Sequence, residues 1–168
     1  VTLDDPEYPE NLRKVRDCPE LLFVKGCLTP GDRIAVAIVG TRNPTVVGQA
    51  VAAEIAADLA AAGVTIVSGL AYGIDACAHS AALNARGRTI ACLGHGVDQV
   101  YPKANWALYR EIPEAGALVS EYLPGTGPKP WHFPERNRLI SGLSLGVVVV
   151  EAGLKSGALI TADWALRQ

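Results

Sequence analysis

The chain has 168 residues, of which 49% are hydrophobic and 17 are glycines, enough for one domain with a full core and unlike a disordered protein. Its net charge of −2 at pH 7 excludes a protein that is basic overall, so any basic site has to be local. No apolar run approaches the ~18 residues of a membrane-spanning helix, and we expect a soluble, cytoplasmic protein with no membrane contact.

The first thirty residues differ from the rest of the chain. Residues 1–30 are predicted to form an irregular, proline-containing arm that packs on the core, with one short apolar run at 21–24. The first twenty residues carry six acids against three bases. The chain does not begin with methionine, so we expect a fragment or a processed chain.

From residue 33 onward, short apolar runs alternate with helical patterns. The expected strands and helices are listed here in chain order: strands at 34–39, 64–68, 89–93, 117–120 and within 145–151, and helices at 45–62, 75–84, 103–112 and from 158 to the end. In the first helix, Val47, Val51, Ile55 and Leu59 recur every four residues. The alternation predicts that residues 31–168 form one α/β domain, a doubly wound, mostly parallel, Rossmann-like sheet.

Glycine-rich loops follow several of the expected strands. In a doubly wound sheet, ligands bind beyond the carboxyl ends of the strands, where the strand order reverses. Gly40, Thr41 and Arg42 follow the first expected strand, and Lys155, Ser156 and Gly157 follow the last. Small residues allow close approach to the backbone, and the helices that follow present free N–H groups, so these loops favour an anion site.

Standard cofactor, metal and catalytic patterns are absent. There is no G-x-G-x-x-G fingerprint after the first strand and no P-loop G-K-[ST], so we expect no cofactor. The four cysteines are scattered without metal-ligand spacing, which predicts neither a zinc site nor disulfides. Asp75 and His79 stand four apart on one expected helix, and we interpret them as structural. Glu151 is expected to order the neighbouring loops, and no catalytic residue is assigned.

Residues 132–144 combine one ring with several polar groups directly before an apolar strand. Arg136 and Arg138 offer guanidinium groups for phosphates, and Phe133 offers a stacking face for a base. With Asn137 between the arginines, this mixture suits a flexible anionic polymer. The alternative is a solvated loop anchored by Phe133.

Taken together, the motifs resemble the DprA/Smf family along essentially the whole chain. The segments that carry the resemblance are 38–42, 68–75 with 78–79, 133–138 with 140–144, and 151–157, supported by 8–12, 101–105 and 120–122. The resemblance implies a non-catalytic, single-stranded DNA-binding protein of natural transformation. Such a protein would protect incoming strands, help to load the RecA recombinase, and form a homodimer.

The family's motifs also imply roles for particular residues. Arg42 would bind a phosphate in a loop shaped by Gly40 and Thr41. The remaining residues of the implied DNA groove are Phe133 as a stacking surface, Arg136, Asn137 and Arg138 along the groove, and Lys155, Ser156 and Gly157 in the anion pocket. Four of these cations (Arg42, Arg136, Arg138 and Lys155) would neutralise about four phosphates, with a salt slope of about −3.

Family members continue past residue 168 into at least one more strand and helix, so we expect the domain to be truncated at its C-terminal end. The missing part resembles the region of the family's dimer and recombinase contacts.

Two other functions stay open. A nucleotide phosphoribohydrolase of the lysine-decarboxylase-like group has a similar loop, P-G-G-x-G-T-x-x-E, but Thr161 stands here in place of its acid. The other is a non-catalytic interaction module.

Overall fold

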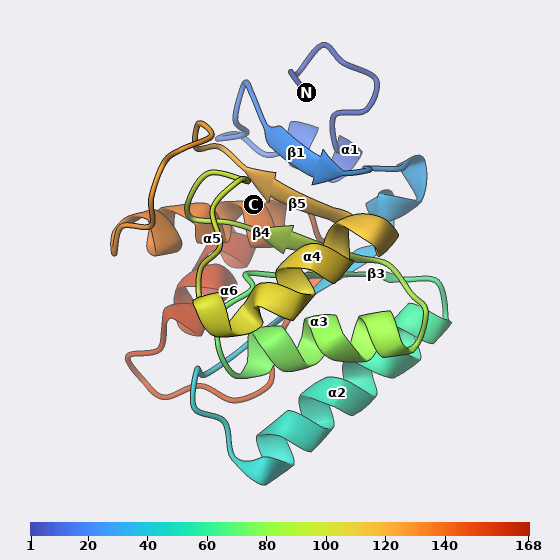
Figure 1. The fold of residues 1–168 in the computed structure, drawn as a ribbon, viewed down its shortest axis with the longest axis vertical. Helices are drawn as coiled ribbons and strands as arrows, with labels where there is room; N and C mark the ends of the chain where they lie inside the picture. The colour runs from blue at the N-terminus through green and yellow to red at the C-terminus, as the bar shows by residue number, and fades with distance from the viewer.

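The computed structural model describes residues 1–168 and contains a single six-stranded sheet (Figure 1). Its strands are β1 (Phe23–Gly26), β2 (Ala35–Val39), β3 (Thr65–Ser68), β4 (Thr89–Cys92), β5 (Ala117–Ser120) and β6 (Gly146–Val149). Their order across the sheet is β1-β5-β4-β3-β2-β6. Strands β2 to β6 run parallel, and β1 pairs with β5 in the antiparallel direction. The predicted doubly wound, mostly parallel sheet is confirmed.

Helices cover both faces of this sheet. They are α1 (Glu10–Arg13), α2 (Val46–Ala61), α3 (Ile74–Asn84), α4 (Trp106–Ala115), α5 (His132–Gly142) and α6 (Gly157–Arg167), with short 3₁₀ turns at Pro30–Arg33 and Lys103–Asn105. Figure 1 shows α2, α3 and α4 together on one face, and α5 and α6 on the other. Strands β3, β4 and β5 are buried at every position, and apart from a Thr or Ser at their ends their residues are apolar, as expected for parallel strands covered on both faces.

The buried stripe of α2 lies one residue away from the valine stripe that the sequence suggested. Ala52, Ala56 and Ala60 are buried against Ile38 and α3, while Val47 is 71% exposed. The helix α3 presents alanines to the same contact. Small side chains on both helices let the two backbones approach closely, so residue size rather than hydrophobicity decides which face of α2 is buried.

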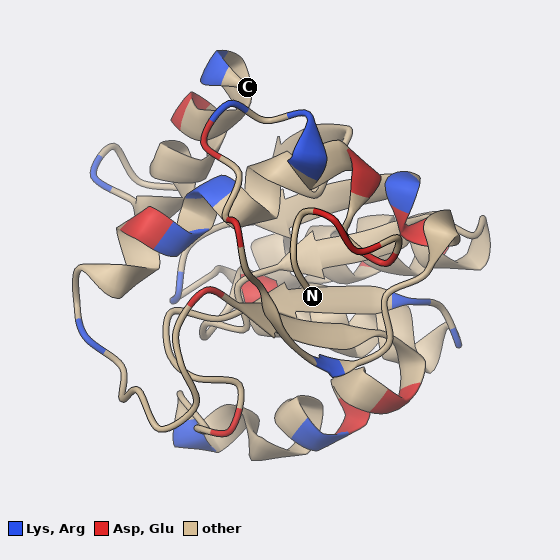
Figure 2. Cartoon of the chain, turned by 90° about the horizontal axis from the view of Figure 1, so that it is seen from above, with Lys and Arg blue, Asp and Glu red and all other residues tan.

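The N-terminal arm is irregular except for α1 and β1. The apolar run at 21–24, predicted within an irregular segment, enters β1, where Val24 pairs with Val119 of β5. Leu12 and Leu22 of the arm are buried in the core beneath α5. Red segments on the loop after the N-terminus in Figure 2 are the arm's acids.

Residues 132–142 form the helix α5 and not a solvated loop, which was the alternative interpretation of their sequence. His132, Arg136, Leu139 and Ile140 recur at helical spacing and are all buried. The helix follows β5 and leads to β6 on the far side of β2. The strand order therefore reverses between β2 and β6, and a crevice at the carboxyl ends of these two strands is the expected ligand position.

Candidate functional site

A cavity of about 540 Å³ lies at this reversal point. All but one of the residues proposed from the sequence line it: Gly40, Thr41 and Arg42 after β2, Phe133, Arg136 and Asn137 on α5, and Lys155, Ser156 and Gly157 before α6. We call it the anion cavity. The exception is Arg138, which lies elsewhere on α5.

Two cations of the anion cavity face solvent. Arg42 and Lys155 are both exposed, and neither has an ion-pair partner in the protein. The helix α6 begins beside Lys155, with Ser156 as its N-cap, whose hydroxyl accepts a hydrogen bond from the N–H of Ala158 at 3.3 Å. A phosphate placed here meets two free cations and the positive end of a helix.

The loop that carries Arg42 is packed against the beginning of α3. The N–H of Ile74 donates to the carbonyl of Thr41 at 3.2 Å. Gly73 has φ +75°, and a Cβ there would lie 2.3 Å from the Thr41 carbonyl oxygen, so no larger residue fits. This close contact fixes the backbone from which the Arg42 side chain extends.

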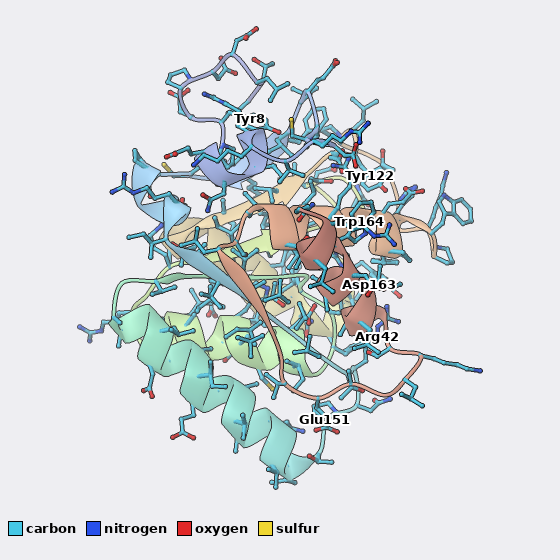
Figure 3. The ribbon with its side chains drawn as sticks, turned by 180° about the vertical axis from the view of Figure 1, so that it is seen from behind. Tyr8, Arg42, Tyr122, Glu151, Asp163 and Trp164 are labelled. Atoms are coloured by element: carbon cyan, nitrogen blue, oxygen red, sulfur yellow. The ribbon has the colours of Figure 1, made fainter.

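Glu151 connects the end of β6 to the beginning of α2 (Figure 3). Its carboxylate accepts hydrogen bonds from the Thr45 N–H at 3.1 Å and from the Thr45 hydroxyl at 2.9 Å. Its carbonyl accepts from the N–H of Thr41 at 2.7 Å. The prediction that Glu151 orders the neighbouring loops is confirmed, because one residue holds the β2 loop and the N-terminus of α2.

Arg136 lines the anion cavity, but its guanidinium is engaged by the protein. The side chain is 4% exposed and donates to the carbonyl of Gly69 at 2.8 Å and to the carbonyl of Cys92. Burial lowers the pKa of Arg136, and the nearby Asp75 carboxylate opposes this shift. Asn137 is engaged in a similar way, since its amide donates to the Gly157 carbonyl at 3.1 Å. These two side chains join α5 to the strand ends and to α6.

Asp75 and His79 do not pair with each other. The Asp75 carboxylate accepts from the N–H of Gly69 at 3.1 Å, and burial raises its pKa, against the effect of Arg136. The His79 ring bonds through Nδ1 to the Thr89 hydroxyl at 2.7 Å. Both residues are buried, as the structural interpretation predicts.

The structure separates Arg138 from the groove that the family motif implied. Its guanidinium forms an ion pair with Glu121 and donates to the carbonyl of Asp17. A residue two positions after Arg136 on a helix points about 200° away from it. Arg138 therefore faces the arm and the end of β5, not the anion cavity.

The ring of Phe133 is half-buried at the border of the anion cavity. It lies 5.5 Å from the Tyr101 ring, centroid to centroid, and beneath the Arg136 guanidinium at 5.8 Å. Tyr72 and Tyr101, which were not predicted as site residues, line a second, smaller cavity next to Phe133. A signal was present, because each of these tyrosines follows a glycine-containing loop at the carboxyl end of a strand.

No three His, Cys, Asp or Glu side chains come together in a way that could hold a metal ion. None of the helices is both long and apolar enough to span a membrane.

Comparison with known proteins gives consistent matches along the whole chain. A family model described as DNA recombination-mediator protein A matches residues 1–168. DNA processing protein DprA of Bacillus subtilis is 44% identical over 171 residues, which cover 100% of this chain and 57% of that protein. This chain spans about half of the length of the curated relatives that it matches.

Two solved structures have the same fold and substantial identity. DNA processing protein A from Streptococcus pneumoniae matches with a TM-score of 0.91 and 43% identity, over 99% of this chain and 58% of that one. DNA processing protein A from Helicobacter pylori matches with a TM-score of 0.86 and 34% identity, over 98% of this chain and 75% of that one. The second structure is described in terms of that protein's single-stranded DNA binding mode.

Proposed function

Since the chain belongs to the DNA recombination-mediator protein A family, also named DprA/Smf, we propose that it binds single-stranded DNA at the anion cavity. The observation that carries this proposal is the pairing of two free cations, Arg42 and Lys155, with the N-terminus of α6 at one crevice. A cation and a helix N-terminus are both complementary to a phosphate. The binding mode named for the Helicobacter pylori relative supports the same ligand class.

We propose the wider role from the family as well. In the whole protein, this domain would hold incoming strands in the cytoplasm during natural transformation and present them to a RecA-type recombinase. A homodimer would carry two such domains. The description of the family as recombination mediators supports this role, and residues outside this chain would contribute to both protein contacts.

The proposed role is binding rather than catalysis. Asp75 is the only carboxylate that lines the anion cavity, and the backbone N–H of Gly69 already occupies its oxygen. Thr161, in the position where a phosphoribohydrolase motif has its acid, is buried in the same cavity and has no carboxylate. Release of free base from nucleoside monophosphates during incubation with the protein would contradict this part of the proposal.

Fluorescence anisotropy with labelled strands tests the binding proposal. We expect a single-stranded oligonucleotide to bind more tightly than a duplex, and the Arg42→Ala/Lys155→Ala variant to lose most of this binding. Arg16→Ala removes an exposed positive charge from the arm, outside the lining of the cavity, and serves as the control for loss of a surface charge. Equal affinity for both strand forms, or a double variant that binds like the control, would overturn the proposal.

A further inference from the structure

An open groove of about 630 Å³ runs along the face of the molecule that α2, α3 and α4 form. Figure 1 shows α3 between α2 and α4 on this face. Val46, Ala50 and Ala53 of α2 line one side of the groove, and Leu108 of α4 lines the other. We call it the helical groove. It shares no lining residue with the anion cavity, so a ligand in the groove does not have to displace a ligand from the cavity.

The floor of the helical groove consists of small side chains of α3. Ala76, Cys77 and Ser80 line it, and each of them is partly exposed. Small residues let a further helix approach the backbone of α3 closely, as α2 already does on the buried side. A groove of this kind accepts an amphipathic helix, whose apolar side chains at i, i+3, i+4 and i+7 fill it.

The apolar lining of the helical groove contributes little to the fold itself. No charged residue lines the groove, and Val46 in the first turn of α2 is 84% exposed. A valine that stays in water gains no burial energy, and valine is also a weaker helix former than alanine. A continuous apolar surface rimmed by polar groups is typical of an interaction site for a protein or a membrane.

The charges beside the helical groove distinguish between these partners. Glu54 follows Ala50 by four residues and Glu111 follows Leu108 by three, so each exposed acid lies on the same side of its helix as a groove residue. Arg110 is the only lysine or arginine in the three helices, and it points about 200° away from Leu108. Acids at the rim favour a basic partner. They oppose an anionic membrane, and they also oppose a second copy of the chain, whose identical acids would face them.

We propose that the helical groove docks an amphipathic helix of a partner protein, with an apolar stripe flanked by lysines or arginines. The stripe covers Val46 and Leu108, and the flanking cations lie beside Glu54 and Glu111. This site goes beyond the proposed binding of DNA. Because the groove and the anion cavity are separate, the protein can hold a strand and a protein partner at the same time.

Fluorescence anisotropy with a designed peptide tests the proposal. The probe is a labelled helical peptide of 16 residues, the length of α2, with leucines at i, i+3, i+4 and i+7 and lysines beside them. In the control peptide, glutamates replace the lysines. Ala50→Lys places a cation in the groove, and the matched control Ala61→Lys places the same cation at an exposed position of α2 outside it. Thermal melting confirms that both variants are folded.

The thiol of Cys77 reports independently where the peptide binds. Cys77 lines the groove and is partly exposed, whereas Cys92 is buried. Replacing Cys18 and Cys27 by serine therefore leaves Cys77 as the one accessible thiol. Burial raises the pKa of the Cys77 thiol, so its alkylation by iodoacetamide is measured at alkaline pH. A helix seated in the groove covers this thiol.

We expect the basic peptide to bind the unmodified protein and Ala61→Lys equally, and to slow the alkylation of Cys77. Ala50→Lys should bind it at least about tenfold more weakly, and the acidic peptide should bind the unmodified protein at least about tenfold more weakly, because like charges across an interface are strongly unfavourable. Absence of binding, equal affinity of the two lysine variants or of the two peptides, or unchanged alkylation would overturn the proposal. A dimer of the protein in sedimentation that Ala50→Lys abolishes would also overturn it, because a second copy would then occupy the groove.

Discussion

The guanidinium of Arg42 lies exposed at the border of two cavities. The guanidinium of Arg136, in contrast, donates hydrogen bonds to the backbone carbonyls of Gly69 and Cys92. A guanidinium already committed to carbonyls has fewer donors for a ligand, and its removal would leave those buried acceptors unpaired. Arg42 is therefore expected to act in binding, and Arg136 mainly in holding the cavity's shape.

The first prediction concerns Arg42→Ala. We expect binding of oligo-dT at low salt to weaken by about 1.5–3 kcal/mol, the usual range for hydrogen bonds to a charged group. The thermal melting temperature should stay within error, because Arg42 has no partner in the protein. Normal affinity in a folded variant would show that Arg42 does not contact phosphate.

Arg138→Ala, in contrast to Arg42→Ala, is expected to lower the stability of the protein and to leave its binding unchanged. Its partner Glu121 is largely buried, and burial raises the pKa of Glu121 against the effect of Arg138. Without Arg138 the carboxyl group loses its charge partner, and we expect the free energy of unfolding to fall by about 1–3 kcal/mol. Urea denaturation measures this loss, and the folded variant should bind oligo-dT normally. If the Arg138→Ala variant is as stable as the unmodified protein but binds oligo-dT more weakly, then Arg138 contacts the strand.

His79 provides a prediction about acid stability. The Thr89 hydroxyl donates to the Ile66 carbonyl and so accepts from Nδ1 of His79, while Nε2 is buried without a partner. Burial lowers the pKa of His79 to about 3. In the unfolded chain, His79 takes up a proton near pH 6.5, whereas in the folded chain it stays neutral down to about pH 3. The free energy of unfolding is therefore unaffected by His79 above pH 6.5. Below that pH it falls by about 1.4 kcal/mol per pH unit until the pH reaches about 3.

The variant His79→Asn can keep the hydrogen bond to Thr89 but cannot be protonated. We expect its melting temperature to depend less on pH between 6.5 and 5 than that of the unmodified protein. The raised pKa of Asp75 acts in the opposite sense and is common to both proteins, so the difference between them isolates His79. Identical pH profiles would mean that His79 accepts a proton in the folded protein.

At the scale of elements, α2 shows how a single glycine adapts a helix to the site. Gly48 lies in its first turn, and a Cβ there would be 2.0 Å from Oε2 of Glu151. The carboxylate would have to leave Thr45, whose N–H and hydroxyl it binds. The small residue thus permits the contact between the end of β6 and the N-terminus of α2.

Gly48→Ala is therefore expected to destabilise the protein, although alanine is favoured over glycine in helices by about 1 kcal/mol. In a Glu151→Ala background the conflict disappears, and the same substitution should become stabilising. Chemical denaturation of the four proteins in this cycle measures the change of sign. If Gly48→Ala has the same effect in both backgrounds, then Glu151 does not constrain α2.

The regular elements of the sheet could be predicted from the sequence, because fully buried parallel strands and the helices between them have distinct patterns. The helix formed by residues 132–142 was harder to predict. Arg136 and Asn137 are polar residues on the buried face of α5, so a reading based on hydrophobicity does not reveal the helix. The functions of the two arginines on this segment, Arg136 and Arg138, also depend on orientation, because the direction of a side chain follows from the helix and not from its place in a motif.

The loops that form the anion cavity could be predicted because topology alone places them. Gly40–Arg42 and Lys155–Gly157 follow strands that had to lie beside the reversal point of a doubly wound sheet. Tyr72 and Tyr101 could not be joined to them from sequence, since their contact depends on hydrogen bonds of one asparagine, Asn105. The spacing of these residues in the sequence does not predict that Asn105 connects the segments of the two tyrosines.

At the scale of the whole molecule, binding of a polyanion by a chain of net charge −2 has to depend strongly on local cations and on salt. Two free cations in the anion cavity give an expected log–log salt slope of about −1.4, at ~0.7 per phosphate contact on a single strand. The four cations of the family motif would give about −3. A titration of affinity against salt concentration distinguishes these values, and a slope near −3 would show that Arg136 and Arg138 also contact phosphates.

The position of β6 has a consequence for how the molecule is made. Val36 of β2 pairs with Gly146 of β6, and the sequence between them holds four helices and three strands of the fold. Contacts so distant along the chain form late in folding, because the intervening loop has to be closed first. During synthesis, β2 leaves the ribosome long before β6, with that side of β2 still unpaired. The anion cavity therefore comes into existence only when β6 docks, and a chain whose synthesis has not reached β6 has no such cavity.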